Sequence, residues 1–495
     1  MLSIILNKMS KRKNLNNVDL SFHLQHPGRG SEPGDPNAIF YLNGVYHLHY
    51  ILRHKWNGVR KNLPRTNFPY NHSHSFIHCT SKDMLNWEWQ KTKLQPIFTR
   101  HGMFSGTGFI TLDKKPAIIY HGENTKNNYV IIAKDNELSK WNKPLPINKN
   151  KFKINFWDPD CFIINNTYYS ISGGINPDLF KSKNLIEWQY VGKFMSKDLD
   201  DVVKGEDISC PNFFKIKNKW VLLCISHSHG CRYYIGDWDK KNEKFIPEVH
   251  ERMNWPDLTD PIYALESRDF FAPETVISKN GRRVMWSWLR IKQIKYSNIL
   301  SIPRELNSYN NKKLSITPLK ELEKLRYDKK ILTKIQIKNK SKNSNDTITK
   351  NIISINFNAI EIKLFIKSSE IKNKRFGFQL FSKNKDIGFP IIFEPESKSI
   401  LVGSTKASLD FQNLYKTKNI EITIFIDHFL IEVFINNIQS VVGIYENFEN
   451  KNLINAYSFN GSFIIEKLLI WKLKKINSGY KKAKKNKIWR VKEKI

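Results

Sequence analysis

Apolar and polar positions alternate over most of the chain, and short turns interrupt the alternation. In Ala38–Tyr50, two apolar runs flank Asn43-Gly44, a dipeptide that favours a type I′ hairpin turn. Similar pairs of runs recur at 161–171 and 212–224. Long helical periodicity is scarce, and the best candidate helix, Pro318–Leu325, has only one or two turns. The pattern predicts an all-β chain.

A short motif occurs three times in the first half of the chain, at Ser81–Trp87, Ala133–Trp141 and Ser182–Trp188. Each copy places a small residue, a lysine and an Asp or Asn shortly before a leucine and a tryptophan. The tryptophans are about 50 residues apart, which is the period of successive four-stranded blades in a β-propeller. We expect each tryptophan to fill the gap between neighbouring blades.

The pattern changes after about residue 300. A stretch rich in Lys, Asn and Ser comes first, and alternating strands between 359 and 435 follow it. Such alternation predicts one buried and one exposed face, as in a β-sandwich. The lysine-rich end is expected to be solvated and mobile. We therefore predict an N-terminal extension (1–20), a propeller (21–310), a linker (311–350), a sandwich (351–475) and a basic tail (476–495).

The composition agrees with two folded domains. The 495 residues exceed the size at which a single hydrophobic core stops growing, and 40% of them are apolar. The net charge of +34 is typical of nucleic-acid binders, but no nucleic-acid-binding motif accompanies it. Lysines are instead spread through predicted turns and exposed strand faces. We therefore expect no specific nucleic-acid partner.

The apolar runs, the N-terminal residues and the cysteines indicate in which cellular compartment the protein works. No apolar run approaches the roughly 20 residues of a membrane-spanning helix, and Met1–Lys13 does not have the order of charges and apolar residues of a signal peptide. The five cysteines form no C-x-x-C pair and their number is odd. We expect reduced thiols, no metal site, no membrane association and a cytoplasmic location.

Three acidic turns stand directly before predicted strands of different repeats. They carry Asp35, Asp158 and the pair Glu206-Asp207. In a propeller such turns can meet at one end of the central axis. Glycoside hydrolysis needs one carboxylate that attacks the anomeric carbon and one acid that protonates the leaving oxygen. The three turns therefore predict a locally acidic glycosidase site.

An ordered series of further motifs joins these turns: D-P-N at 35–37, F-S-G-T at 104–107, W-D-P at 157–159, A-P-E at 272–274, L-S-I-P-R-E-L at 300–306 and L-I-E-V-F-I at 430–435. With them, residues 22–473 resemble glycoside hydrolase family 32, the group of invertases, levanases and inulinases. The resemblance implies a five-bladed β-propeller followed by a C-terminal β-sandwich, and no metal or organic cofactor.

The resemblance also assigns roles. It implies that Asp35 is the nucleophile and that Asp158 binds fructose hydroxyls and supports the transition state. It implies a small-molecule or oligosaccharide substrate. Contacts to that substrate are expected at Asn37, Trp56, Phe104, Ser105, Trp157, Asp207 and Glu274.

Three positions depart from the family pattern. Ser209 stands where the acid/base glutamate of the family's W-E-C-P motif is expected, and a serine is a poor proton donor at neutral pH. We expect Glu206 to take this role, with Asp207 as the alternative. Trp157 replaces an arginine, and Ile51 replaces a glutamine. His227-Ser-His229, together with Arg232, is a further candidate for contacts to the substrate.

The sequence therefore predicts a retaining glycosidase that acts on β-fructofuranosides, of the sucrose or fructan type, through a covalent fructosyl intermediate. Two alternatives stay open because the departures surround the sugar pocket. One is a relative with changed glycan specificity or fructosyl transfer. The other is a sugar-binding protein without catalytic activity. The oligomeric state is not predicted.

Overall fold

A computed structural model describes residues 15–28, 32–57, 72–149, 152–253, 270–291, 299–339, 347–356, 358–383, 388–448 and 452–493. Strands dominate these residues and the helices are short, which confirms the all-β prediction. Two compact units divide the chain. The larger unit comprises 23–290, 296–323 and 476–495, and the smaller one 1–22, 291–295 and 324–475. Within the described ranges, no helix is long and apolar enough to cross a membrane.

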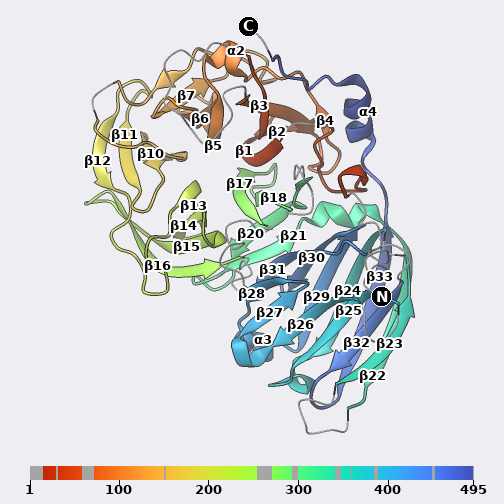
Figure 1. Cartoon of the computed structure of the whole chain (residues 1–495). Coiled ribbons are helices and arrows are strands. Elements are labelled where there is room, and N and C mark those ends of the chain that lie inside the picture. Colours follow the sequence, from red (N-terminus) through yellow and green to blue (C-terminus); the bar gives the residue numbers. More distant parts are fainter. Residues whose placement is uncertain are drawn as a thin grey trace, which may run out of the picture. The chain divides into compact units, whose positions relative to one another are not determined.

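The larger unit contains five sheets that follow one another along the chain (Figure 1). The first two consist of β1 (Glu32–Leu42), β2 (Val45–Lys55), β3 (His72–Ser81), β4 (Glu88–Trp89), and of β5 (Met103–Ile110), β6 (Pro116–Gly122), β7 (Asn127–Ile132), β8 (Leu145–Pro146). The next two consist of β9 (Pro159–Ile164), β10 (Thr167–Ser172), β11 (Asp178–Ser182), β12 (Gln189–Lys193), and of β13 (Ser209–Ile216), β14 (Lys219–Ser226), β15 (Gly230–Asp239), β16 (Lys244–Arg252). The fifth consists of β17 (Phe271–Ile277), β18 (Arg283–Leu289), β19 (Ile299–Leu300), β20 (Arg304–Ser308) and β21 (Leu314–Pro318).

The first strands of these sheets close a ring. Strand β1 contacts β5 and β17, and β5, β9, β13 and β17 contact one another in that order. The ring with its radiating sheets is the arrangement of a β-propeller, as predicted (Figure 1). Tight hairpins connect the strands. The predicted turn at Asn43-Gly44 is confirmed, since both residues have positive φ angles (48° and 84°), as a type I′ turn requires.

The repeated tryptophans pack between consecutive sheets, which confirms the role predicted for the motif. Trp141 is buried in a cluster formed by residues of the first and second sheets, and Trp188 in a cluster formed by the second and third. Trp87 meets Trp286 of β18 edge to face, with 6.0 Å between ring centroids. The motif therefore holds adjacent sheets of the ring together.

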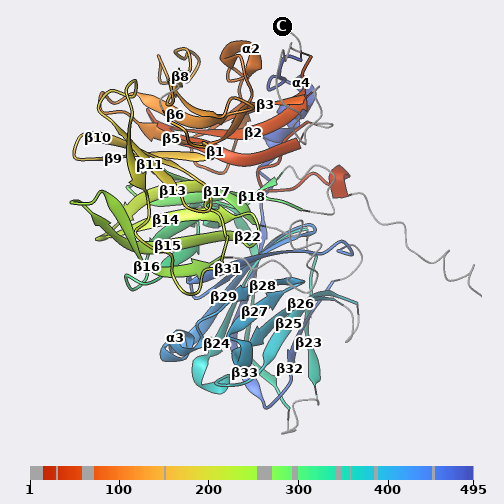
Figure 2. The same ribbon diagram turned by 60° about the vertical axis from the view of Figure 1, so that its left-hand side comes forward.

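The smaller unit is a β-sandwich, also as predicted. Two six-stranded sheets form its layers (Figure 2). One has the order β22 (Arg326–Ile337), β33 (Phe463–Leu473), β24 (Ala359–Lys367), β29 (Asn419–Asp427), β30 (Leu430–Ile435), β31 (Gln439–Ile444). The other has the order β23 (Ile348–Ser354), β32 (Leu453–Ser458), β25 (Phe376–Ser382), β26 (Phe389–Glu394), β27 (Ser399–Val402), β28 (Thr405–Ser408). The described helices of the whole chain are short. Those of the smaller unit are η1 (Leu15–Asn17), η3 (Ser368–Glu370), η4 (Pro395–Ser397) and α3 (Phe411–Lys416), those of the larger unit are α2 (Pro96–Thr99) and α4 (Ser478–Asn486), and η2 (Lys320–Leu325) contains the boundary between the units.

The linker predicted at 311–350 is largely regular structure instead. Strand β21 belongs to the larger unit, the boundary between the units at residues 323 and 324 falls within η2, and β22 already belongs to the sandwich. The predicted N-terminal extension is also folded where it is described: it contains η1, and Leu15, Val18 and Leu20 are buried. The next two residues, Ser21 and Phe22, fall within the range predicted for the propeller but belong to the smaller unit, where they donate backbone hydrogen bonds to the Asp427 carboxylate (2.8 and 3.0 Å). Residues 1–14 lie outside the described part.

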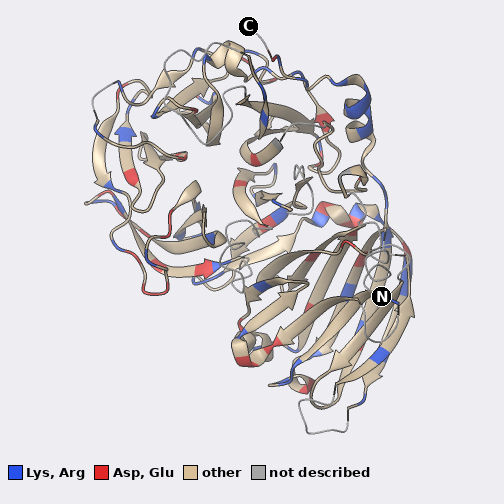
Figure 3. Cartoon of the chain, viewed as in Figure 1, with Lys and Arg blue, Asp and Glu red and all other residues tan. Residues whose placement is uncertain are grey.

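The prediction of a solvated, mobile basic tail is wrong for residues 476–493. These residues form α4 and a following segment, and they belong to the larger unit. Tyr480, Ala483 and Trp489 are buried, and the Trp489 ring lies edge-on to His26 with 4.5 Å between centroids. Lys481, Lys482 and Lys485 of α4 are exposed, and other Lys and Arg residues are spread over both units (Figure 3).

Candidate active site

A cavity of about 840 Å³ lies at the centre of the ring in the larger unit. The starts of β1, β5, β13 and β17 and the segment before β9 contribute to its wall. Its lining residues are Pro33, Gly34, Asp35, Ile51, Arg53, His74, Phe104, Ser105, His121, Asn124, Lys126, Asn155, Phe156, Trp157, Asp158, Cys210, Ile225, His227, Phe271, Trp288 and Arg290. The predicted convergence of the turns at Asp35 and Asp158 is therefore observed.

Irregular strand starts direct side chains into this cavity. The β1–β2 pairing shifts register around Asp35, between Pro33 and Ala38. The β13–β14 pairing shifts between Ser209 and Asn212, where Cys210 has a φ of 46°. A β-bulge changes the direction in which a side chain points, and bulges are common next to active sites. The acidic and glycine- or proline-containing turns of the sequence thus produce the local geometry of the site.

Asp35 accepts two hydrogen bonds on one carboxylate oxygen. Ser105 Oγ donates to Oδ2 over 2.7 Å, and the Cys210 thiol donates to the same atom over 3.6 Å. Burial raises the pKa of Asp35, and these two hydrogen bonds act in the opposite direction. The two donors therefore support an ionised carboxylate at a desolvated position.

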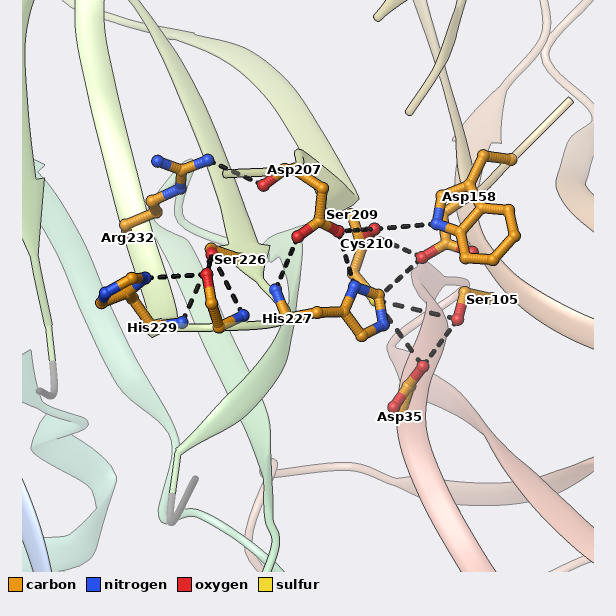
Figure 4. Close-up of polar contacts among 12 residues, drawn as sticks. Asp35, Ser105, Asp158, Asp207, Ser209, Cys210, Ser226, His227, His229 and Arg232 are labelled. Atoms are coloured by element: carbon orange, nitrogen blue, oxygen red, sulfur yellow. Dashed lines mark hydrogen bonds and ion pairs between the residues drawn. The ribbon is translucent and has the colours of Figure 1, made fainter. Parts of the chain in front are cut away.

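Asp158 lies on the other side of Cys210. The Cys210 backbone N–H donates to Asp158 Oδ2 over 3.1 Å, and the thiol is 3.6 Å from the same oxygen. Burial, followed by the charge of Asp35, raises the pKa of Asp158 to about 6. Cys210 thus connects the two predicted catalytic carboxylates, as the contacts in Figure 4 show.

Ser209 takes part in a chain of hydrogen bonds beside these carboxylates. Its hydroxyl donates to Asp207 Oδ2 over 2.7 Å and accepts from Trp157 Nε1 over 2.9 Å. The same Asp207 oxygen lies 2.5 Å from His227 Nδ1, and the His227 backbone N–H donates to Asp207 Oδ1 over 2.8 Å. Although burial opposes it, the hydrogen bonds and charge of His227 lower the pKa of Asp207.

Glu206 is not brought to the cavity. Arg252 donates to both of its carboxylate oxygens (2.8 and 2.7 Å), and Arg232 Nη1 lies 3.0 Å from Oε2. Burial alone would raise the pKa of Glu206, but the Arg252 hydrogen bonds and the charges of both arginines lower it to about 2. The glutamate is a firmly ionised partner of two arginines, which is the reverse of what a proton donor requires.

The other predicted contacts divide into two groups. Phe104, Ser105 and Trp157 line the cavity. Four residues are absent from its described lining: Asn37, Trp56, Asp207 and Glu274.

Two of these four have evident structural partners. Asn37 accepts a hydrogen bond from Gly106 N over 2.8 Å and so ties β1 to β5. Glu274 is buried and accepts from Asn212 Nδ2 over 3.0 Å, and burial raises its pKa well above the usual range. Their predicted role as substrate contacts is not supported by this geometry.

Several lining residues carry no signal in the sequence. The cations Arg53, Lys126 and Arg290 come from separate segments and belong to none of the acidic turns. They modify the expectation of a locally acidic site, since positive side chains face the same cavity. In the described part of the chain, no group of three or more His, Cys, Asp or Glu residues is arranged to hold a metal ion.

Comparison with known proteins adds two family matches. The protein-family model described as "Glycosyl hydrolases family 32 N-terminal domain" matches residues 33–318, and the family model described as "Glycosyl hydrolases family 32 C terminal" matches residues 321–472. A curated sucrose-6-phosphate hydrolase of Vibrio alginolyticus is 26% identical over 59% of this chain and 62% of its own length. That match covers less than two thirds of the relative. A levanase of Bacillus subtilis is 25% identical over 89% of this chain and 68% of its own length.

Among solved structures, fructan 1-exohydrolase IIa from Cichorium intybus has a similar fold. Its TM-score is 0.72 at 18% identity, and the match covers 92% of this chain and 97% of that one. At this identity the likeness concerns the fold alone. It agrees with the propeller and sandwich described above.

Proposed function

The chain belongs to glycosyl hydrolase family 32, and we propose that it is a retaining glycoside hydrolase acting on β-fructofuranosides of the sucrose or fructan type. The observation that carries the proposal is the pair Asp35 and Asp158, which lie on either side of Cys210 in one cavity. Catalysis through a covalent glycosyl intermediate needs carboxylates with distinct tasks around the anomeric carbon.

Asp35 is the nucleophile of this proposal. Its carboxylate forms a bond to the anomeric carbon of the fructosyl unit while the bond to the leaving oxygen breaks. The Ser105 hydroxyl and the Cys210 thiol hold the attacking carboxylate in one direction. Asp158 accepts hydrogen bonds from fructose hydroxyls, and these strengthen as positive charge develops on the ring.

A phosphorylated fructoside is a second candidate substrate. Arg53, Lys126 and Arg290 line the cavity together with the carboxylates, and arginine and lysine are the usual ligands of phosphate groups. One of the relatives is named a sucrose-6-phosphate hydrolase. An anionic group on the leaving sugar would find these cations at the cavity wall.

Product analysis on a substrate panel tests the function. The panel contains sucrose, sucrose 6-phosphate, inulin, levan and a broader glycan set, and the readout is released fructose. We expect release by the unaltered protein and none by Asp35→Ala. Proton NMR of the first product should show retained configuration, and an inverted anomer would contradict the covalent intermediate.

Other results of this assay support the alternatives. New fructosylated oligosaccharides would indicate fructosyl transfer. Tight binding of an oligosaccharide without turnover would indicate a sugar-binding protein, and release from unrelated glycans would indicate changed specificity.

We also propose that the protein works in a reducing compartment such as the cytoplasm. All five cysteines are free and buried, and Cys210 donates its thiol proton to Asp35 and its backbone N–H to Asp158. Cell fractionation tests this location directly.

A further inference from the structure

Ser209 cannot supply the proton that the leaving group needs. It occupies the position at which the family pattern has a glutamate, and its hydroxyl is already engaged by Asp207 and Trp157. A hydroxyl is a weak acid at neutral pH, so this contact does not replace a carboxylic acid. A proton donor has to come from another side chain at the cavity.

Glu206 is not this proton donor. Its side chain is 1% exposed and is held by Arg252 and Arg232 away from the cavity lining. A carboxylate in such a pair stays ionised through the pH range in which enzymes of this kind operate. The neighbouring Asp207 carboxylate has three contacts of its own, one with Ser209 and two with His227, and its pKa is lowered.

His227 has the required position. It follows β14 and lines the cavity that contains Asp35 and Asp158. Its Nδ1 is bonded to Asp207, so the proton at Nδ1 points to the carboxylate and Nε2 is the nitrogen on the other side of the ring. In Figure 4 the imidazole lies beside the Asp207 carboxylate and overlaps Cys210, whose thiol contacts Asp35 and Ser105.

The charges around the ring suit a proton carrier. The ionised Asp207 lies at Nδ1, and Asp35 and Asp158 are the carboxylates whose pKa values respond to the charge of His227. Anions next to an imidazole stabilise its protonated form. An imidazole also exchanges protons in the neutral pH range, where a serine does not.

We infer that His227, oriented by Asp207, is the general acid/base of this enzyme in place of the usual glutamate. The inference rests on the proposed β-fructofuranosidase function. Asp207 is a positioning residue: it fixes the tautomer and orientation of the ring, as a carboxylate does in a Ser-His-Asp triad.

The proton balance is complete within the site. In the first step Asp35 bonds to the anomeric carbon, the bond from this carbon to the leaving oxygen breaks, and Nε2–H transfers its proton to that oxygen. In the second step the neutral Nε2 takes a proton from water. The water oxygen then bonds to the anomeric carbon, and Asp35 leaves as a carboxylate.

Leaving-group dependence tests the inference. In His227→Ala we expect kcat/KM for sucrose to fall by about 10²- to 10⁴-fold, the usual contribution of general acid catalysis. The value for 4-nitrophenyl β-fructofuranoside should change far less, because nitrophenolate leaves without a proton. Added azide should restore turnover and yield fructosyl azide, since azide needs no general base.

The controls separate the possible failures. His250→Ala removes another histidine whose Nδ1 pairs with an aspartate, but one that does not line the cavity, and it should keep the sucrose rate. If His227→Ala lowers kcat/KM equally for sucrose and for the nitrophenyl fructoside, the inference is overturned while the function stands. The same holds if Glu206→Gln, and not His227→Ala, keeps its rate on the nitrophenyl fructoside and is rescued by azide. If the unaltered protein cleaves no fructoside at all, the proposed function fails first and the inference falls with it.

Discussion

His227 Nδ1 lies 2.5 Å from Asp207 Oδ2, and this oxygen also accepts the Ser209 hydroxyl proton over 2.7 Å. The pair predicts a change in the pH profile of Asp207→Asn. The carboxylate stabilises the protonated imidazole, so its loss lets the ring release its proton at lower pH. We expect the alkaline limb of the kcat/KM profile to move to lower pH, measured with sucrose.

The pair of His250 and Asp201 is a matched control for this variant. His250 Nδ1 lies 2.9 Å from Asp201 Oδ2, and neither residue lines the cavity. Asp201→Asn should leave the profile in place. An unchanged alkaline limb in Asp207→Asn would mean that Asp207 does not act on the titrating group.

Much of the fold can be predicted from local patterns, because local chemistry decides it. Asn43-Gly44 forms its hairpin turn because both residues tolerate a positive φ. The spacing of Trp87, Trp141 and Trp188 identifies the blades since each ring fills the space between two sheets. The tail was predicted wrongly because lysines dominate its composition, while Trp489 decides its packing.

The site was predicted only in part, because pairings between distant residues determine the rest. Asp35 and Asp158 follow from their turns. The geometry does not support the role predicted for Glu206, and the sequence does not reveal this because its partner Arg252 is 46 residues away on β16. The contact of Asp207 with His227 does have a signal, because the β13–β14 register pairs Ser209 with Ile225. Asp207 lies two positions before Ser209 and His227 two positions after Ile225, so an extension of the same register brings them opposite each other.

The raised pKa of Asp158 predicts that its charge lowers stability. Its pKa is about 6 in the folded protein against an ordinary value of 3.8. The folded state therefore binds the proton more tightly, and the free energy of unfolding falls as pH rises from about 4 to 6. Asp158→Asn should abolish hydrolysis and yet melt at a higher temperature than the unaltered protein at pH 7.

The melting temperatures should be compared at pH 4 and pH 7. The difference in melting temperature between Asp158→Asn and the unaltered protein should shrink towards pH 4, where the carboxyl group of Asp158 is protonated. Asp237→Asn is the control, because the Asp237 side chain is 51% exposed in its pair with Lys219 and such exposed pairs contribute little to stability. A variant that melts below the unaltered protein at pH 7 would contradict the assignment.

The cations of the cavity predict substrate discrimination. Arg290→Ala should lower kcat/KM for sucrose 6-phosphate by about 10- to 100-fold, which corresponds to the roughly 1.5 to 3 kcal/mol lost with a charged hydrogen bond. The value for sucrose should change little. Equal losses on both substrates would show that Arg290 supports the cavity and does not recognise phosphate.

The C-terminal segment predicts a stability effect at a distance from the cavity. Trp489 is 7% exposed, its carbonyl accepts from Thr92 Oγ1 over 2.5 Å, and its ring meets His26. His26 Nδ1 in turn lies 2.6 Å from the Tyr50 hydroxyl, and Tyr50 pairs with Pro36, the residue after Asp35. The segment therefore supports the strand pair that carries the nucleophile.

Trp489→Ala should lower the free energy of unfolding of the larger unit by about 3 kcal/mol, the usual cost of deleting a buried tryptophan. Denaturant unfolding followed by intrinsic fluorescence measures it. Lys482→Ala is the matched control on α4, because its pair with Glu88 is exposed and is worth at most about 1 kcal/mol. If both variants unfold at the same denaturant concentration, the segment does not stabilise the ring. If only Trp489→Ala is destabilised, residues 476–493 are an integral part of the larger unit. This variant should then also lose its hydrolysis activity at a lower temperature than the unaltered protein, because it unfolds at a lower temperature.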